Sequence, residues 1–132
     1  MRELTGQVRA GRGLGSAVMT GKHLERLEEL LGFRPVPGTL NVRMTEPVVR
    51  DESWRYLAAG DIGPDWQGLT AQSGYFYLPI LVAGHRGIAF QAVEAEPGYP
   101  PDQLELICET KLRSELGLAD GDPLTFAIRD EP

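Results

Sequence analysis

Two residue types that often build active sites are scarce in this sequence of 132 residues. It contains one cysteine, Cys108, and two histidines, His23 and His85. A single cysteine excludes a disulfide within the chain and any cysteine-rich metal site. The histidines share no ligand spacing with acidic residues, so we expect both to be solvated surface residues. Cys108 lies in the apolar run LELIC and is expected to be a buried thiol without a chemical role.

Long apolar runs and an excess of basic residues are also missing. No stretch of about 18 apolar residues occurs, so no membrane-spanning helix is predicted, and residues 1–13 lack the apolar core of a signal peptide. Acidic residues outnumber basic ones by 19 to 13, which gives a net charge of -6. This balance argues against binding to nucleic acid or to an anionic membrane surface. We therefore expect a cytoplasmic monomer with small-molecule ligands.

The fold class follows from many short segments separated by turn residues. The length and the 42% share of hydrophobic residues fit a single domain over residues 1–132. The turns indicate antiparallel pairing, so the expected fold is mainly β, a small closed barrel with two short helices over its ends. Strands are expected at residues 4–11, 39–44, 75–83, 88–96, 104–108 and 123–130, with one more after the glycine-rich turn that follows residue 10.

The clearest helix is predicted over residues 21–31, with Thr20 as its N-cap and Gly32 as its C-terminal stop. Four leucines recur there at helical spacing: Leu24, Leu27, Leu30 and Leu31. A second, shorter helix is predicted within residues 109–118, ending at Gly117.

Two apolar segments, 75–83 and 88–96, predict a hairpin. The residues between them, Gly84-His85-Arg86-Gly87, are the expected turn. Pro79 in the first segment indicates a sheet edge or a bulge, because proline has no backbone N–H to donate.

A glycine-rich stretch, GRGLG, occupies residues 11–15. Glycines at alternate positions allow the backbone to approach a ligand closely. The stretch lacks the Lys-Ser/Thr ending of a Walker A loop and the spacing of a dinucleotide-binding turn. From its residues alone, it is either part of a phosphate site or a plain turn between two strands.

The segment FRPVPGTLNVRM, residues 33–44, places Thr39 and Asn41 directly after a Pro-Gly corner. In an extended chain these two side chains point to the same side. Two neutral oxygen ligands on one side suit Mg²⁺, which takes few protein ligands when phosphates supply the rest. The alternative is that Pro37-Gly38 is a turn and Thr39 merely begins a strand.

Glu105 is the charged residue in the apolar run LELIC. Its neighbours on the same strand face are Gln103 and Ile107, so this face is not simply a solvated one. A carboxylate held there is suited to accept a proton as a general base. The alternative is a charge on an edge strand that discourages aggregation. Lys111 and Arg113, on the second predicted helix, are expected to be solvated.

Four of these segments, taken in order, resemble the CTP-dependent riboflavin kinases known chiefly from archaea. They are the glycine-rich turn, LGFRPVPGTLNV at residues 31–42, GYFYLPI at residues 74–80 and LELICETKLRSELGLADGD at residues 104–122. The resemblance runs from about Gly6 to Ile128, and its second and fourth segments are specific in combination.

The resemblance implies a six-stranded barrel of the cradle-loop type. It implies transfer of the γ-phosphate of CTP to the ribityl 5′-hydroxyl of riboflavin, giving FMN and CDP. Thr39 and Asn41 fall on the family's Thr-x-Asn motif for Mg²⁺, and Glu105 falls on an acidic position to which the physical argument assigns the role of base. The implied nucleotide loop consists of Gly11, Arg12, Gly13, Leu14, Gly15 and Ser16.

Other functions stay open beside this one. The chain departs from the family pattern at residues 16–18, where an aromatic is usual, and at EPGYPPDQ, residues 96–103, which has no Lys or Arg. A related kinase with another acceptor or nucleotide, or a non-catalytic module that senses a nucleotide or a flavin on the same barrel, is compatible with these departures. A DNA-binding barrel is disfavoured by the acidic charge.

Overall fold

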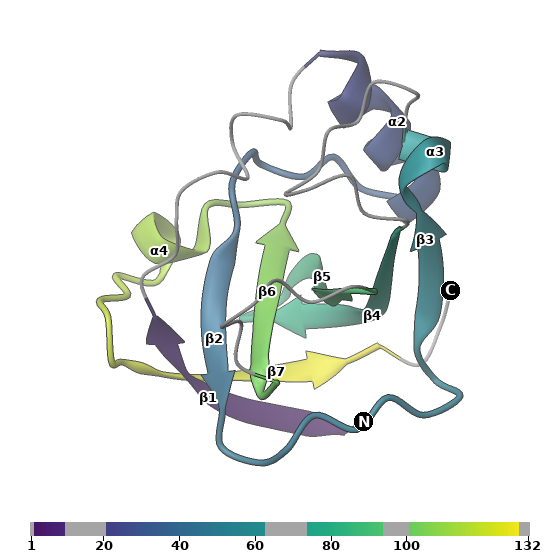
Figure 1. The fold of residues 1–132 in the computed structure, drawn as a ribbon. Coiled ribbons are helices and arrows are strands. Elements are labelled where there is room, and N and C mark those ends of the chain that lie inside the picture. The colour runs from purple at the N-terminus through teal and green to yellow at the C-terminus, as the bar shows by residue number, and fades with distance from the viewer. Residues whose placement is uncertain (1, 10–20, 63–73, 94–100, 130–132) are drawn as a thin grey trace.

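The computed structural model describes residues 2–9, 21–62, 74–93 and 101–129, and these residues form seven strands and three short helices (Figure 1). The mainly β architecture is the expected one, with α3 as a helix that the sequence did not predict. No helix in these ranges is long and apolar enough to cross a membrane. The strands are β1 (Glu3–Arg9), β2 (Leu40–Met44), β3 (Arg55–Ala58), β4 (Gly74–Val82), β5 (His85–Ala92), β6 (Gln103–Cys108) and β7 (Pro123–Ile128). The helices are α2 (Lys22–Leu31), α3 (Ala59–Ile62) and α4 (Leu112–Glu115).

The strands form one antiparallel sheet in the order β3-β4-β5-β6-β2-β1-β7, and an additional pairing of β4 with β7 closes six of them into a barrel. β4 has room for three partners because one of its edges is divided. Residues 74–77 pair with β3, whereas Ile80 and Leu81 pair with β7. Pro79 lies where this edge changes partner, and its carbonyl accepts the backbone N–H of Arg129 at 2.9 Å.

Alternation along the strands sorts their side chains into two hydrophobic cores. Even-numbered residues of β2, β6 and β7, together with Leu78, Ile80 and Val82 of β4, point into the barrel and form most of the larger core. Outward residues of β3–β6 form the second core together with α2 and α3, which lie next to each other at one end of the barrel (Figure 1). The second core is built from Leu24, Leu27, Phe33, Leu57, Ile62, Tyr75, Ile88 and Ile107.

Helix α2 matches the helix predicted from the leucine spacing. Leu24 and Leu27 are buried, and the two following leucines are half-buried against the second core. Gly32 ends the helix in a left-handed conformation with φ 82°, and its N–H donates to the Glu28 carbonyl at 2.9 Å. The predicted cap was wrong: the N-cap position is occupied by Gly21, and Thr20 lies outside the described residues.

The β4–β5 hairpin forms, but its turn lies earlier than the sequence predicted. The turn residues are Ala83 and Gly84, with φ 48° and 83°. Positive φ at both central residues is the geometry of the tight turns whose twist fits an antiparallel pair. Gly87 lies inside β5 opposite Ile80, so its glycine character serves strand packing and not the turn.

Gly87 is required by the close approach of β6. A Cβ atom there would lie 2.6 Å from the carbonyl oxygen of Ile107, a backbone atom that cannot swing away. We expect Gly87→Ala to lower the free energy of unfolding by about 1–3 kcal/mol, measured by chemical denaturation. Gly60→Ala is the control, because Gly60 lies in α3, where an added Cβ would meet no described atom within 4 Å outside its own helix and chain neighbours. An equal loss in both variants would contradict the packing argument.

Candidate active site

The Pro-Gly corner before β2 presents Thr39 and Asn41 on the outer side of the barrel. Gly38 has φ 111°, a conformation that favours glycine, and this residue turns the chain into β2. The corner is held to β6 by a hydrogen bond from the Val36 N–H to the Cys108 carbonyl, at 2.9 Å. Asn41 is only 8% exposed and Thr39 is half-buried. The sequence-based expectation that both side chains share one side agrees with this geometry.

Glu105 joins these two residues from the neighbouring strand. It pairs directly with Asn41 in the β2–β6 register and is 6% exposed. The Thr39 hydroxyl donates to Glu105 Oε1 at 3.3 Å, although the two residues are 66 positions apart in the chain. β6 lies between β5 and β2, so the alternative of a charge on an edge strand is wrong.

The registers extend this pairing into a row of side chains across the outer barrel face. Directly opposed residues in antiparallel strands point to the same face. The part of this row on the β2 side is polar, with Asn41 beside Glu105. The part on the β5 side is aromatic, with Phe90 beside Tyr77. In full, the outer row runs Arg9, Asn41, Glu105, Phe90, Tyr77 and Arg55. Glu105 therefore lies at the boundary between the polar and the aromatic side chains of this row.

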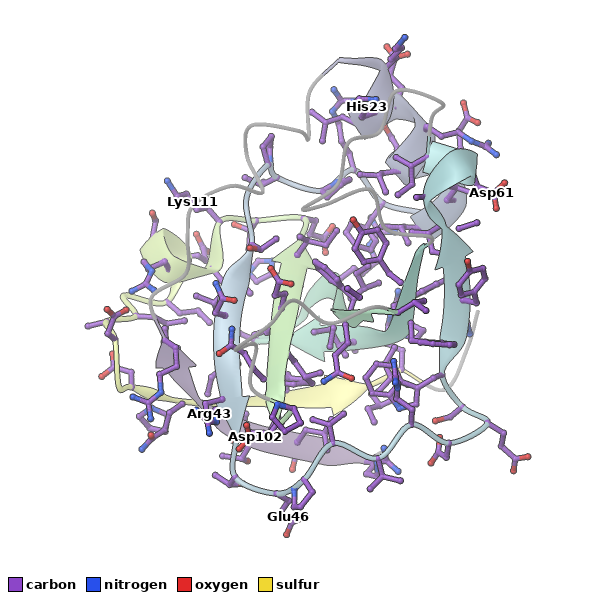
Figure 2. All side chains as sticks on the ribbon, in the orientation of Figure 1. His23, Arg43, Glu46, Asp61, Asp102 and Lys111 are labelled. Atoms are coloured by element: carbon purple, nitrogen blue, oxygen red, sulfur yellow. The ribbon has the colours of Figure 1, made fainter. Side chains whose placement is uncertain are left out.

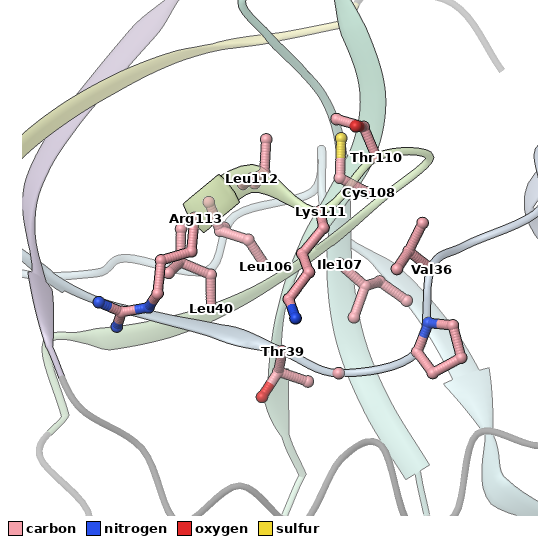
Figure 3. A pocket seen from close by; sticks show the side chains of 12 residues that line it. Val36, Thr39, Leu40, Leu106, Ile107, Cys108, Thr110, Lys111, Leu112 and Arg113 are labelled. Carbon is pink, nitrogen blue, oxygen red and sulfur yellow. The ribbon is translucent and has the colours of Figure 1, made fainter. Parts of the chain in front are cut away.

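A pocket of about 120 Å³ opens beside Thr39, between the Pro-Gly corner and the start of α4. Its lining includes Lys111 and Arg113, and Figure 3 shows the Lys111 ammonium group directed toward Thr39. Arg113 forms an ion pair with Asp120 at 3.0 Å. Lys111 is exposed, as expected from the sequence, and Arg113 is half-buried. The buried Leu112 between them also lines the pocket.

The oxygen atoms beside this pocket fit a hard divalent cation. Among the described residues, no three His, Cys, Asp or Glu side chains gather into a metal site. Thr39 keeps lone pairs on its hydroxyl when it donates to Glu105. The Asn41 Oδ1 atom accepts one hydrogen bond, from Gln103 Nε2 at 2.9 Å, and has a second lone pair. Two neutral oxygens leave most of the coordination shell to phosphates and water, as Mg²⁺ sites commonly do.

Other residues considered from the sequence lie elsewhere. The glycine-rich stretch from Gly11 to Ser16 lies outside the described residues. Both histidines are half-buried, and His85 Nε2 is 3.8 Å from a Glu115 carboxylate oxygen. Cys108 is buried as expected, and its burial raises the pKa of the thiol, which donates to the Arg86 carbonyl at 3.0 Å.

Residues 8–128 match the family model CTP-dep_RFKase, whose description reads "Domain of unknown function DUF120". A riboflavin kinase of Methanocella arvoryzae is 34% identical over 126 residues, which cover 95% of this chain and 56% of that protein. Riboflavin kinases of Methanoculleus marisnigri and Pyrobaculum islandicum are 36% and 34% identical, over 95% of this chain and 56% and 59% of their own lengths. The chain thus spans just over half the length of these curated relatives. Since the family model covers nearly the whole chain, the chain belongs to the CTP-dependent riboflavin kinase family.

Proposed function

We propose that this domain transfers the γ-phosphate of CTP to the 5′-hydroxyl of riboflavin, giving FMN and CDP. The observation that carries the proposal is the convergence of Thr39, Asn41 and Glu105 on one barrel face, beside a cationic pocket. Membership in the family and the names of the relatives support the same activity. The relatives are longer than this chain, so the reaction is a proposal for this domain.

The donor side of the site is the half near α4. Lys111 and Arg113 supply positive charge for phosphate oxygens in a chain whose net charge is -6. Thr39 and Asn41 would hold a divalent cation, for which we propose Mg²⁺. When bound, such an ion neutralises developing phosphate charge. The residues Gly11 to Ser16, outside the described ranges, stay the predicted nucleotide loop.

The acceptor side is the aromatic half of the outer row. Phe90 and Tyr77 offer ring surface for an isoalloxazine, and Phe90 already contacts Tyr75 edge-on at a centroid distance of 5.6 Å. Glu105 lies between this surface and the metal ligands. In the reaction, the acceptor oxygen forms a bond to the γ-phosphorus while the bond from phosphorus to the CDP oxygen breaks. Glu105 accepts the proton that the hydroxyl releases.

The test is an assay of riboflavin with Mg²⁺ and each of CTP, ATP, GTP and UTP, with FMN as the readout. We expect FMN formation with CTP well above the other three. FMN formation with ATP at the same rate would leave a riboflavin kinase without CTP preference. No FMN with any nucleotide, together with tight flavin or CDP binding, would favour the sensing module instead.

Lys111 is expected to contribute to nucleotide affinity. Replacing it with alanine removes a charge-assisted contact to phosphate, so CDP should bind about 10- to 100-fold more weakly in calorimetric titrations. Arg2→Ala is the matched control, because Arg2 lines a different pocket at the Met44 end of β2. Unchanged CDP affinity in Lys111→Ala would place the phosphates away from this pocket.

We further propose that residues 1–132 act as a single domain and as a monomer in the cytoplasm. Sedimentation of the purified protein tests the monomer, and a dimer at micromolar concentration would contradict it.

A further inference from the structure

Gln103 is a side chain at the candidate metal site to which no role has been assigned above. It begins β6, two residues before Glu105, and is half-buried. Its Nε2 atom donates to Asn41 Oδ1 at 2.9 Å. The two residues are diagonal neighbours across the β2–β6 pair, because Asn41 is opposite Glu105 and Arg43 is opposite Gln103.

The hydrogen bond decides which end of the Asn41 amide is presented to a ligand. An asparagine side chain has one oxygen, which binds cations, and one NH₂ group, which does not. A half-turn of the amide would exchange the two. The Nε2 donor of Gln103 favours the orientation of the Asn41 amide in which Oδ1 faces Gln103. This hydrogen bond uses one of the two lone pairs of Oδ1. The other lone pair is the one that a cation held with the help of Thr39 would use.

The backbone at Gln103 is held by side chains from both neighbouring strands. Its backbone carbonyl accepts the Gln91 Nε2 donor at 3.1 Å, and the same amide also donates to Pro101 at 3.2 Å. Arg43, opposite Gln103, forms an ion pair with Asp102 that lowers the pKa of this carboxyl (Figure 2). The start of β6 is therefore anchored on both sides of the residue that contacts Asn41.

We propose that Gln103 is a positioning residue that presents the Asn41 carbonyl oxygen to the divalent cation. This inference rests on the proposed function, because it assumes that Asn41 is a metal ligand. Residues outside the coordination shell that orient a ligand commonly change metal affinity by about 10- to 100-fold when they are replaced. Gln103 acts through Asn41 and needs no contact with the nucleotide or the flavin.

The test compares CDP binding by calorimetry with Mg²⁺ and with EDTA. The ratio of the two affinities is the enhancement due to the metal. In Gln103→Leu we expect this enhancement to fall about tenfold, while the CDP affinity in EDTA stays at the wild-type value. Gln103→Asn is the second variant, because it keeps an amide but is one methylene too short to reach Asn41. Gln7→Leu is the control, a glutamine on the exposed outer face of β1.

If the role of Gln103 is only structural, both variants should have a lower melting temperature and an unchanged Mg²⁺ enhancement. That result would overturn this inference and leave the proposed function intact. Absence of any Mg²⁺ enhancement in the wild-type protein would overturn the metal site and this inference together. Absence of CDP binding in the wild-type protein would overturn the proposed function as well. A tenfold loss of enhancement in either folded Gln103 variant, with Gln7→Leu unaffected, supports it.

Discussion

Glu105→Gln is expected to lower turnover by about 10²- to 10⁴-fold while CTP affinity stays near the wild-type value. Glutamine keeps the size of the side chain and an oxygen that can accept the Thr39 hydroxyl, which lies 3.3 Å from the carboxylate in the native protein. What it loses is the basic oxygen that, in the proposed reaction, takes the proton from the acceptor hydroxyl. The measurements are steady-state FMN formation and calorimetric CTP binding on the same purified variant.

The two measurements separate the possible roles of Glu105. If the carboxylate supports the metal through a water molecule, affinity and turnover should fall together. If its role is only structural, turnover should stay close to the wild-type value, and the base assignment would be refuted. Glu29→Gln is a matched control, since it makes the same chemical change in an ion-paired carboxylate on α2.

Asn41→Ala and Thr39→Ala are expected to have the second large effect. Each variant removes one of the two proposed neutral oxygen ligands, so CTP binding in the presence of Mg²⁺ should weaken by about 100-fold, the upper end of the range for residues that only support a ligand. Binding in EDTA should change little, because neither substitution removes charge. Calorimetric titrations with and without Mg²⁺ measure the difference.

Conservative substitutions at the same positions provide the controls. Thr39→Ser keeps the hydroxyl and should retain most of the Mg²⁺ dependence, and Asn41→Asp keeps an oxygen ligand. Removal of Asn41 also takes a buried polar group out of the β2–β6 interface, so thermal unfolding of Asn41→Ala should be followed in parallel. Equal CTP binding by all four variants would exclude Thr39 and Asn41 as metal ligands.

The sequence predicted the local features of the site, because these follow from strand and helix periods. The side-by-side placement of Thr39 and Asn41 comes from the two-residue period of an extended chain, and α2 comes from its leucine spacing. The pairing of Asn41 with Glu105 could not be predicted from the residues, because it depends on the β2–β6 register. Register is set by packing across the whole barrel.

The errors have the same physical origin. Gly87 was assigned to a turn because glycine is common in turns, whereas its true constraint is a carbonyl of β6 that no local pattern contains. Lys111 is exposed as expected, but its place in the wall of the pocket beside Thr39 was not predicted, because the two residues are remote in sequence. In each case, the deciding neighbour lies on a distant strand.

The alternation that sorts strand residues into two faces has a consequence for how this domain can evolve. In β2 and β6, even-numbered positions fill the barrel, whereas three odd-numbered positions, Asn41, Gln103 and Glu105, carry the candidate chemistry. Substitutions at these three positions can therefore alter the ligand while the fold persists, whereas substitutions at the even-numbered positions damage the core whatever the ligand. Selection for stable folding and selection for ligand binding therefore act on different residues of the same strand. A protein with this barrel can change its substrate while it keeps its fold.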